Sequence, residues 1–347
     1  MQPRTGRRGL AAVETLHAAY DEQAAQTPEA LAVICRPCPV GEQLRSSLTY
    51  AALRERSQAL AVGLARRLHP WPESQGRGRQ SIVAVQLPRT HADFVPLVVA
   101  VSRVGLPFVL LSTDLPDRTL EAQRAALALR LLQPCLYVAH AKAEVPAAVS
   151  ECGDCQVVAV EDLASTPCDA PISVSATAAE KQGSKGSGIL CFLFTGGTQR
   201  TKIVEATHAM VLHERGAYQE LWRPRTPTGA VVLAHTSVYW GASALGQLSI
   251  ALAFGGTAVC TDAAEIAELR RCIAEENVTV LGVVPDHLDL LAPQNPAVDL
   301  PSVEAVFTWG ERLPRRVADR WRNHPHARLF ELLIATEYWL SLWADPL

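Results

Sequence analysis

Hydrophobic positions follow two alternating spacings along the chain. Residues 11–26 and 49–67 place apolar residues three and four apart, which is typical of amphipathic helices. Helical patterns also cover 118–132 and 262–276. Between these segments lie short runs rich in β-branched residues and bounded by Gly, Pro or polar clusters, which predict strands: LAVIC, SIVAVQL, PFVLL, QVVAV, GILCFLF, AVVLAH, TAVC and VTVLGVV. The alternation predicts an α/β fold in which mostly parallel sheets are sandwiched by helices.

Length and charge limit the classes of partner. The chain has 347 residues, of which 48% are apolar and 19% charged, and this fits one large or two ordinary domains. Two polar stretches, 70–80 and 164–188, are predicted to be loops. The net charge of -3, without long runs of either sign, gives no electrostatic reason to expect nucleic acid. We therefore expect a small molecule or another protein as the partner.

The apolar segments do not predict a membrane span. Even FVPLVVAVSRVGLPFVLL contains Arg103 and two prolines, and no stretch reaches the roughly 18 apolar residues needed. The opening MQPRTGRRGLAA has three arginines but no apolar core of a secretory signal. We expect residues 1–12 to be a flexible N-terminus and the chain to be cytoplasmic, with a transit peptide as the alternative.

Nine cysteines include two C-x-x-C pairs, Cys35 with Cys38 and Cys152 with Cys155. This spacing occurs in zinc sites, but the two pairs are much farther apart than the 15 to 20 residues of a zinc ribbon. Ordinary reduced thiols are the alternative, which the odd total of cysteines favours over a complete disulfide framework. Cys191 and Cys260 lie in apolar runs and are predicted to be core residues.

The segment TGGTQRTK, residues 195–202, follows the predicted strand GILCFLF and has the composition of a phosphate-binding turn. Gly196 and Gly197 allow the backbone to approach a ligand or to adopt positive φ. Hydroxyls and cations that suit phosphate oxygens come from Thr195, Thr198, Thr201, Arg200 and Lys202. A solvent-exposed strand-to-helix turn uses the same residue types, and the Walker pattern G-x-x-x-x-G-K-[ST] is missing from the sequence.

This segment resembles the phosphate-binding loop of the AMP-forming adenylate-forming enzymes, which include acyl-CoA synthetases, luciferases and the adenylation domains of nonribosomal peptide synthetases. Their pattern, roughly [YF]-T-S-G-T-T-G-x-P-K-G, is matched by Phe194, Thr195, Gly197, Thr198 and Lys202 when one residue is deleted before the lysine. Further segments resemble family motifs in the same order: LHAAYDEQAAQTPEALAV (16–33), LTY (48–50), VAVSRVGLPFVLLSTDLPDRTL (99–120), VTVLGVVPDHLDLL (278–291), WGERLP (309–314) and LLIATE (332–337).

The resemblance implies the large N-terminal domain of an acyl-CoA synthetase/luciferase-like fold over residues 13–347, with ATP and Mg²⁺ as cofactors. Its reaction would be attack of a carboxylate on the α-phosphorus of ATP, which yields an acyl-adenylate and pyrophosphate. Residues implied to contact the nucleotide are Thr195, Gly196, Gly197, Thr198, Lys202, Gly310, Glu311 and Thr336. Glu337 would hold Mg²⁺, although a solvated glutamate at a helix start is the alternative. Thr195, Lys202 and Glu337 are the implied catalytic residues.

The substrate pocket is implied by the segment 235–259, in which we single out His235, Trp240 and Gly241. Relatives that activate amino acids carry an aspartate here, and Gly241 stands at the position that we align with it. Because a buried ammonium without a partner is costly, a hydroxy, keto, fatty or aryl acid is expected. His235 and His287 are expected to be polar positions without an acid–base role. The acceptor would be CoA or the phosphopantetheine thiol of a carrier protein.

The sequence also departs from the family pattern. Gln199, Arg200 and Thr201 replace its second glycine and its proline, and Leu333 stands where a tyrosine usually stacks on adenine. The chain ends at Leu347, before the ribose-binding aspartate, the hinge and the small C-terminal domain with the catalytic lysine. We therefore expect this chain alone to be poorly active or inactive. A degenerate, noncatalytic nucleotide-binding or scaffolding module that retains only the fold is the alternative.

Overall fold

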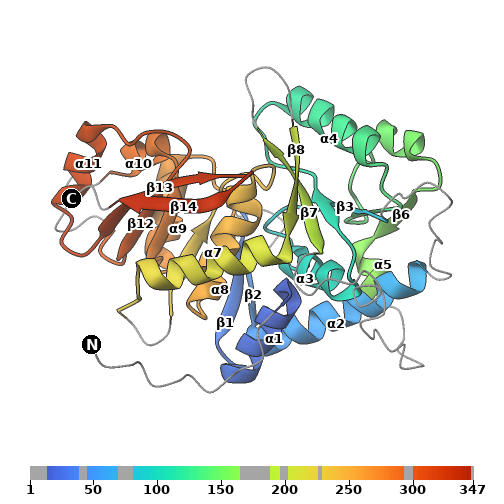
Figure 1. Ribbon diagram of the computed structural model, residues 1–347, viewed down its shortest axis with the longest axis horizontal. Coiled ribbons are helices and arrows are strands. Elements are labelled where there is room, and N and C mark those ends of the chain that lie inside the picture. Colours follow the sequence, from blue (N-terminus) through green and yellow to red (C-terminus); the bar gives the residue numbers. More distant parts are fainter. Residues whose placement is uncertain are drawn as a thin grey trace.

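The computed structural model contains two β-sheets that lie side by side with helices around them (Figure 1). Sheet A has eight strands in the order β14-β13-β12-β11-β9-β10-β1-β2, and sheet B has six in the order β6-β5-β3-β4-β7-β8. The structure describes residues 14–38, 45–68, 81–164, 188–195, 202–225, 229–292 and 300–344.

The elements keep the labels of Figure 1. The strands are β1 (Leu31–Arg36), β2 (Ser46–Thr49), β3 (Val83–Gln86), β4 (Phe108–Leu110), β5 (Leu136–Ala139), β6 (Gln156–Ala159), β7 (Ile189–Thr195), β8 (Lys202–Thr207), β9 (Val231–Ala234), β10 (Thr257–Thr261), β11 (Val280–Val283), β12 (Ala305–Thr308), β13 (Arg328–Ala335) and β14 (Trp339–Ala344). The helices are α1 (Leu16–Gln26), α2 (Tyr50–Arg67), α3 (Phe94–Val104), α4 (Arg118–Leu132), α5 (Val160–Ala164), α7 (His208–Leu221), α8 (Gln247–Ala253), α9 (Ile266–Glu275), α10 (Pro285–Leu291) and α11 (Arg315–Arg322), together with a 3-10 helix η1 (Ala147–Cys152) and a π-helix η2 (Ala242–Gly246).

Strand pairing is parallel inside both sheets and antiparallel only at their edges. In sheet A, β1 pairs with β2 and β13 with β14 in antiparallel fashion, whereas the pairs between them are parallel. In sheet B, the antiparallel pair is β7 with β8. The predicted α/β fold with mostly parallel sheets is confirmed.

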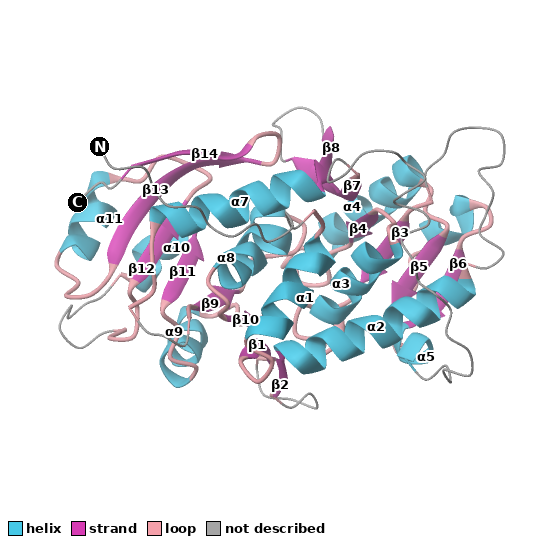
Figure 2. Cartoon of the chain, turned by 60° about the horizontal axis from the view of Figure 1, so that its bottom comes forward, coloured by secondary structure: helices cyan, strands magenta, loops and turns pink. Residues whose placement is uncertain are grey.

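The molecule consists of five alternating layers of helices and sheets, and clusters of apolar side chains lie between them. Alternate residues of a strand face opposite sides of its sheet, so Val232 of β9 faces the central layer and Leu233 faces the outer one. The central layer contains α1, α2, α3, α7 and α8 and packs against both sheets. Helices α9, α10 and α11 cover the outer face of sheet A, and α4 with η1 covers that of sheet B (Figure 2).

Local sequence signals explain where several helices begin and end. The side chains of Thr15, Thr49, Asp117 and Thr207 accept hydrogen bonds from backbone N–H groups in the first turns of α1, α2, α4 and α7. Helix α3 ends at Gly105, whose φ of 78° suits a residue without a Cβ. Among the helices of the described ranges, none is both long and apolar enough to cross a membrane.

Most predicted elements occur with slightly different ends. The exception is the segment after the candidate phosphate-binding loop, residues 195–202. A strand, a turn and then a helix were expected there. Instead, β8 returns antiparallel to β7, and α7 begins only at His208. The ladder to β7 satisfies the backbone groups of Lys202–Thr207 as a strand. The predicted loops at 70–80 and most of 164–188, and the N-terminus 1–12, lie outside the described residues.

The cysteine pairs lie in different parts of the fold. Cys35 is buried in β1 and its thiol donates to the His91 carbonyl oxygen at 3.7 Å, whereas the Cys152 thiol donates to the Ala148 carbonyl oxygen at 3.3 Å. Within the described ranges, no group of three or more His, Cys, Asp or Glu side chains could hold a metal ion. Cys191 and Cys260 are buried core residues, as predicted.

Gly256 allows two backbones to approach closely where α8 turns into β10. A Cβ at this position would lie 1.9 Å from the Ala230 carbonyl oxygen, and the Tyr50 hydroxyl donates to the Gly256 carbonyl oxygen at 2.7 Å. We expect Gly256→Ala to lower the free energy of unfolding by about 1–3 kcal/mol, because the turn must shift. Chemical denaturation measures this. Gly216→Ala in α7 is the control, since no described atom beyond its chain neighbours and its own helix backbone would lie within 4 Å of its Cβ; equal losses in both variants would contradict the prediction.

Candidate nucleotide and acid site

Several of the residues singled out from the sequence lie at the carboxyl ends of parallel strands of sheet A. His235 directly follows β9, Gly310 and Glu311 follow β12, and Thr336 and Glu337 form the turn after β13. Ligands of α/β proteins commonly bind outside these ends of the strands. The topology therefore places these residues along one edge of sheet A.

Gly241 joins this edge to sheet B. A Cβ at Gly241 would lie 2.9 Å from Leu193 Cδ1 of β7 and 3.6 Å from Thr336 Cγ2. The residue is buried, so its backbone packs directly against both neighbours. A side chain at this point would have to displace the end of the flexible Leu193 side chain. The structure thus brings Thr336, the segment from His235 to Gly241 and the β7–β8 hairpin together.

The β7–β8 hairpin contains both ends of the candidate phosphate-binding loop, residues 195–202. Thr195 at the end of β7 is the register partner of Lys202 at the start of β8. Thr195 is nearly buried, whereas Lys202 is exposed. An exposed ammonium opposite a buried threonine hydroxyl suits an anionic ligand. Gly196, Gly197 and Thr198 lie outside the described residues.

Gly310 begins the segment that follows β12. Its φ of 95° lies in the left-handed region, and a Cβ would be 3.4 Å from Val284 Cγ1. Glu311 is exposed. The segment is tied back to β13, since the Leu313 N–H donates to Glu331 Oε1 at 2.8 Å.

Glu337 is exposed at the turn between β13 and β14. No metal-holding cluster of three acidic, His or Cys side chains includes it among the described residues. This arrangement does not suit a magnesium site built only from protein ligands. It does suit Mg²⁺ bound through one carboxylate together with phosphate oxygens, which is the usual way in which Mg²⁺ meets nucleotide substrates.

His235 is buried and pairs with a second histidine. Its Nε2 lies 3.2 Å from Nδ1 of His287 in α10, and no described residue bonds to its Nδ1. Burial, followed by the nearby His287 and Arg89, lowers the pKa of His235 to about 3. His235 is therefore a neutral imidazole at pH 7 and presents no positive charge to the site.

An aromatic stack connects Trp240 to the strand that leads into the loop. The Tyr239 ring is stacked on Phe194 of β7, with centroids 5.8 Å apart, and packs edge-on against the Trp240 ring at 5.0 Å. The guanidinium carbon of Arg124 from α4 lies 4.1 Å from the centroid of Tyr239 and 5.6 Å from that of Trp240. Sequence reasoning missed both residues: Arg124 belongs to no motif, and Tyr239 was not singled out within the segment 235–259.

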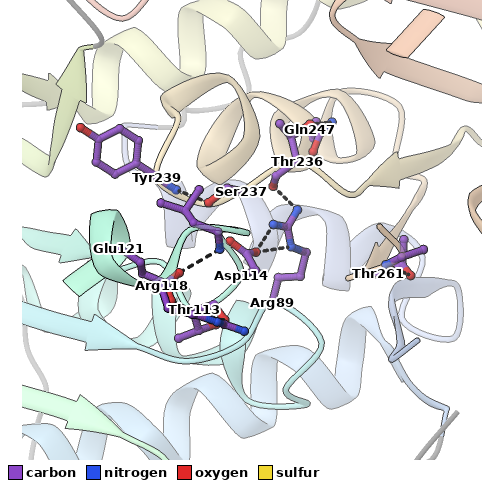
Figure 3. A network of polar contacts seen from close by, with 12 residues as sticks. Arg89, Thr113, Asp114, Arg118, Glu121, Thr236, Ser237, Tyr239, Gln247 and Thr261 are labelled. Carbon is purple, nitrogen blue, oxygen red and sulfur yellow. Dashed lines mark hydrogen bonds and ion pairs between the residues drawn. The ribbon is translucent and has the colours of Figure 1, made fainter. Parts of the chain in front are cut away.

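A buried arginine of sheet B, Arg89, pairs with an aspartate of the same sheet and bonds to the segment that follows β9 of sheet A (Figure 3). Arg89, which follows β3, bonds to Asp114, which follows β4; its Nε lies 3.1 Å from Asp114 Oδ2. The same guanidinium donates to the carbonyl oxygen of Thr236, next to His235. This contact fixes the start of the 235–241 segment against sheet B. The sequence contained no signal that would distinguish Arg89 from an exposed arginine.

Comparisons with known proteins match this chain over most of its length. The family model of AMP-binding enzymes matches residues 20–345. Tyrocidine synthase 3 from Brevibacillus parabrevis is 25% identical over 345 residues, which cover 96% of this chain and 5% of that protein. The nonribosomal peptide synthetase otaB from Aspergillus carbonarius is 25% identical over 311 residues, 90% of this chain and 14% of that protein. The chain thus spans a small part of these curated relatives.

Solved structures share the fold. The N-terminal subdomain of NpsA from Klebsiella oxytoca, in complex with 3-hydroxyanthranilyl-AMSN, has a TM-score of 0.73 at 18% identity and covers 98% of this chain and 79% of that one. A putative long-chain-fatty-acid CoA ligase from Rhodopseudomonas palustris has a TM-score of 0.73 at 20% identity, over 96% of this chain and 79% of that one. The fold is that of the N-terminal domain of adenylate-forming enzymes. Since the family model covers nearly the whole sequence, the chain belongs to the AMP-binding enzyme family.

Proposed function

We propose that this chain supplies the N-terminal part of an adenylation domain, over residues 13–347, that uses ATP to activate a carboxylic acid within a larger synthetase or ligase. A carboxylate oxygen of the acid forms a bond to the α-phosphorus of ATP. The bond from that phosphorus to the bridging oxygen breaks, and pyrophosphate leaves with the electron pair. Family membership supports adenylate formation in general. The observation that carries the proposal is the packing of Gly241 against Leu193 and Thr336, which gathers the implied nucleotide and acid segments.

Each segment has a distinct role in this proposal. Lys202, Thr195 and the loop between them neutralise the β- and γ-phosphates, and Thr336 donates to the α-phosphate. Gly310 and Glu311 border the adenine. Glu337 would hold Mg²⁺ with phosphate oxygens, and the ion would neutralise charge that develops on the departing pyrophosphate.

The acid occupies the segment that contains His235, Trp240 and Gly241. A carboxylic acid is ionised at pH 7 and needs no general base to attack phosphorus. The neutral state of His235 fits this requirement, because an imidazole with a pKa near 3 is unprotonated and only weakly basic at neutral pH. The acyl-adenylate would pass to CoA or to the phosphopantetheine thiol of a carrier protein.

A noncatalytic nucleotide-binding or scaffolding module is the second candidate. Leu333, at the position where relatives stack a tyrosine on adenine, is 51% exposed. An exposed leucine offers less stacking surface to a purine than an aromatic ring. This observation favours weak nucleotide binding over efficient turnover.

Lys202→Ala is expected to weaken ATP–Mg²⁺ binding by about 10- to 100-fold, because a charge-assisted hydrogen bond to phosphate contributes about 1.5–3 kcal/mol. Isothermal titration calorimetry on the chain measures this, and Glu337→Ala should lower affinity only when Mg²⁺ is present. Lys142→Ala and Glu144→Ala are controls, since both residues are exposed in the segment after β5. Equal effects of the site and control variants would contradict the assignments.

Thermal unfolding with and without ATP–Mg²⁺, followed by an activity assay, distinguishes the two candidate functions. A site that closes on nucleotide gains about 2.7 kcal/mol at a 100-fold excess over Kd. Pyrophosphate exchange with a panel of acids, on a polypeptide extended past Leu347, then tests turnover. Stabilisation without exchange favours the noncatalytic module, and no stabilisation by ATP–Mg²⁺ or by an acyl-adenylate analogue would refute the proposed activation.

A further inference from the structure

Gln247, the first residue of α8, is a fully buried amide that bonds to two separate segments of the chain. Its Nε2 donates to Thr236 Oγ1 at 3.2 Å and to the carbonyl oxygen of Gly282 in β11 at 2.7 Å. Because a backbone carbonyl only accepts, these contacts establish which end of the amide carries the nitrogen. One side chain thus connects the segment that follows β9 with the interior of β11.

The bond from Gln247 to Thr236 closes a loop of the chain, residues 236–247, that contains Trp240 and Gly241. The two bonded residues are eleven positions apart, and the π-helix η2 lies between Gly241 and Gln247. Thr236 is held twice, since its backbone carbonyl also accepts a hydrogen bond from Arg89 (Figure 3). Its carbonyl is therefore tied to sheet B and its hydroxyl to α8, which determines where the loop 236–247 begins.

Through Gly282, the same amide is connected to the segment that borders the adenine in the proposed function. A Cβ at Gly282 would lie 2.4 Å from Trp309 Cη2, so the Trp309 ring packs directly against the Gly282 backbone. Trp309 is buried and immediately precedes Gly310. Gln247 therefore bonds both to the loop in which we place the acid and to the strand against which the nucleotide segment packs.

The stability of the core does not by itself explain an amide at this position. Gln247 Oε1 is buried and receives no hydrogen bond from any described residue. A buried acceptor without a donor lowers the free energy of unfolding. Methionine has nearly the same length and would avoid that cost, although it would lose both donated bonds. Placement of the loop 236–247 explains the amide better than stability does.

We propose that Gln247 is a positioning residue that sets the place of the acid relative to the α-phosphorus of ATP. In this role it touches neither reactant and acts through Thr236 and Gly282. The inference rests on the proposed activation of a carboxylic acid. Attack on phosphorus needs reacting atoms about 3–3.5 Å apart, and a displacement of about 1 Å can cost about 100-fold in rate. Loss of the amide should therefore impair the acid site while nucleotide binding persists.

Acyl-adenylate analogues test this role on the chain itself. Calorimetry would compare 5′-O-sulfamoyladenosine with its benzoyl and hexanoyl derivatives. The ratio of the Kd without the acyl group to the Kd with it, called here the acyl gain, isolates the contribution of the acid. We expect Gln247→Met to lower the acyl gain about 10-fold or more and to leave the Kd of sulfamoyladenosine nearly unchanged. Thr236→Val removes the hydroxyl that accepts the bond and should lower the acyl gain as well.

Gln219→Met is the matched control. The Gln219 amide of α7 also donates to a backbone carbonyl, that of Ala253 at the end of α8 at 2.5 Å, but the residue is exposed. This variant should retain the acyl gain. The double variant of Gln247→Met with Thr236→Val should lose no more than Gln247→Met alone, because both substitutions remove the same hydrogen bond.

Fluorine NMR of the protein labelled with 5-fluorotryptophan gives a readout that a general loss of stability would not move. The Trp240 resonance, assigned by its absence in Trp240→Phe, lies within the loop 236–247 and should shift in Gln247→Met. The resonance of Trp321, which is buried in α11, should stay in place.

The outcomes distinguish this inference from the proposed function. An acyl gain that survives Gln247→Met, an equal loss of sulfamoyladenosine affinity, or an unchanged Trp240 resonance would overturn the positioning role and leave the proposed activation intact. If sulfamoyladenosine binds the wild type but neither acyl group strengthens its binding, the positioning role also fails while nucleotide binding stands. If sulfamoyladenosine and both derivatives fail to bind, the proposed activation fails as well.

Discussion

Arg89→Met is expected to lower the free energy of unfolding by about 3–5 kcal/mol, because it leaves a mostly buried carboxylate without its partner. The Arg89 side chain is 5% exposed and that of Asp114 is 14% exposed. Asp114 Oδ1 already lacks a hydrogen bond from any described group, so the guanidinium supplies most of the compensation for its charge. The variant also removes the donor to the Thr236 carbonyl. Urea denaturation followed by circular dichroism measures the loss.

Two further variants show whether the loss of stability comes from breaking this ion pair or from removing any arginine. Arg130→Met removes an arginine from an exposed pair with Glu151, whose side chains are 57% and 48% exposed, and should change stability little. Arg89→Met combined with Asp114→Leu removes both charges and should recover part of the loss. A double variant less stable than Arg89→Met alone would show that the electrostatic explanation is wrong.

Sequence patterns predicted those parts of the fold that short-range signals determine. Helix α4 has the predicted bounds, 118–132, because Asp117 caps it and its apolar residues keep the helical spacing. Most of the apolar runs that predicted strands match strands buried on both faces of a parallel sheet, whereas QVVAV forms the partly exposed edge strand β6. Pairings between distant segments could not be predicted. Strand β1 pairs with β10, more than 200 residues later, and β8 is a strand because β7 offers it a partner.

The candidate site also contains some residues that sequence motifs predicted and others that only the fold reveals. Thr195, Lys202, Thr336 and Glu337 were singled out because they fall on motifs, and the topology explains how their segments meet. Arg89 beside the site and Glu214 in α7 fall on no motif, and their importance depends on burial. For Glu214 one signal was available: it lies on the apolar stripe of α7 with Val211, Tyr218 and Leu221, at spacings of three and four. A glutamate inside such a stripe predicts a buried carboxylate.

Glu214→Gln is expected to stabilise the protein increasingly as pH rises from 5 to 9. The pKa of Glu214 is raised from 4.5 to about 8, first by burial, while the hydrogen bond from Tyr218 acts in the opposite direction. Above pH 4.5 the unfolded chain releases this proton but the folded chain keeps it. The wild type therefore loses stability with rising pH until the folded carboxyl ionises near pH 8. The difference between pH 5 and pH 9 is up to about 4 kcal/mol, since one pKa unit corresponds to about 1.4 kcal/mol.

Glutamine keeps the shape and one acceptor of the side chain but does not titrate, so the variant should lack this loss. The measurement is urea denaturation of wild type, Glu214→Gln and Glu220→Gln at pH 5, 7 and 9. Other titrating groups change all three proteins alike, and only the difference between Glu214→Gln and wild type reports on this carboxyl. A difference that stays constant with pH would mean that Glu214 ionises normally in the folded chain. That result would contradict the neutral carboxyl that burial predicts for Glu214 at pH 7.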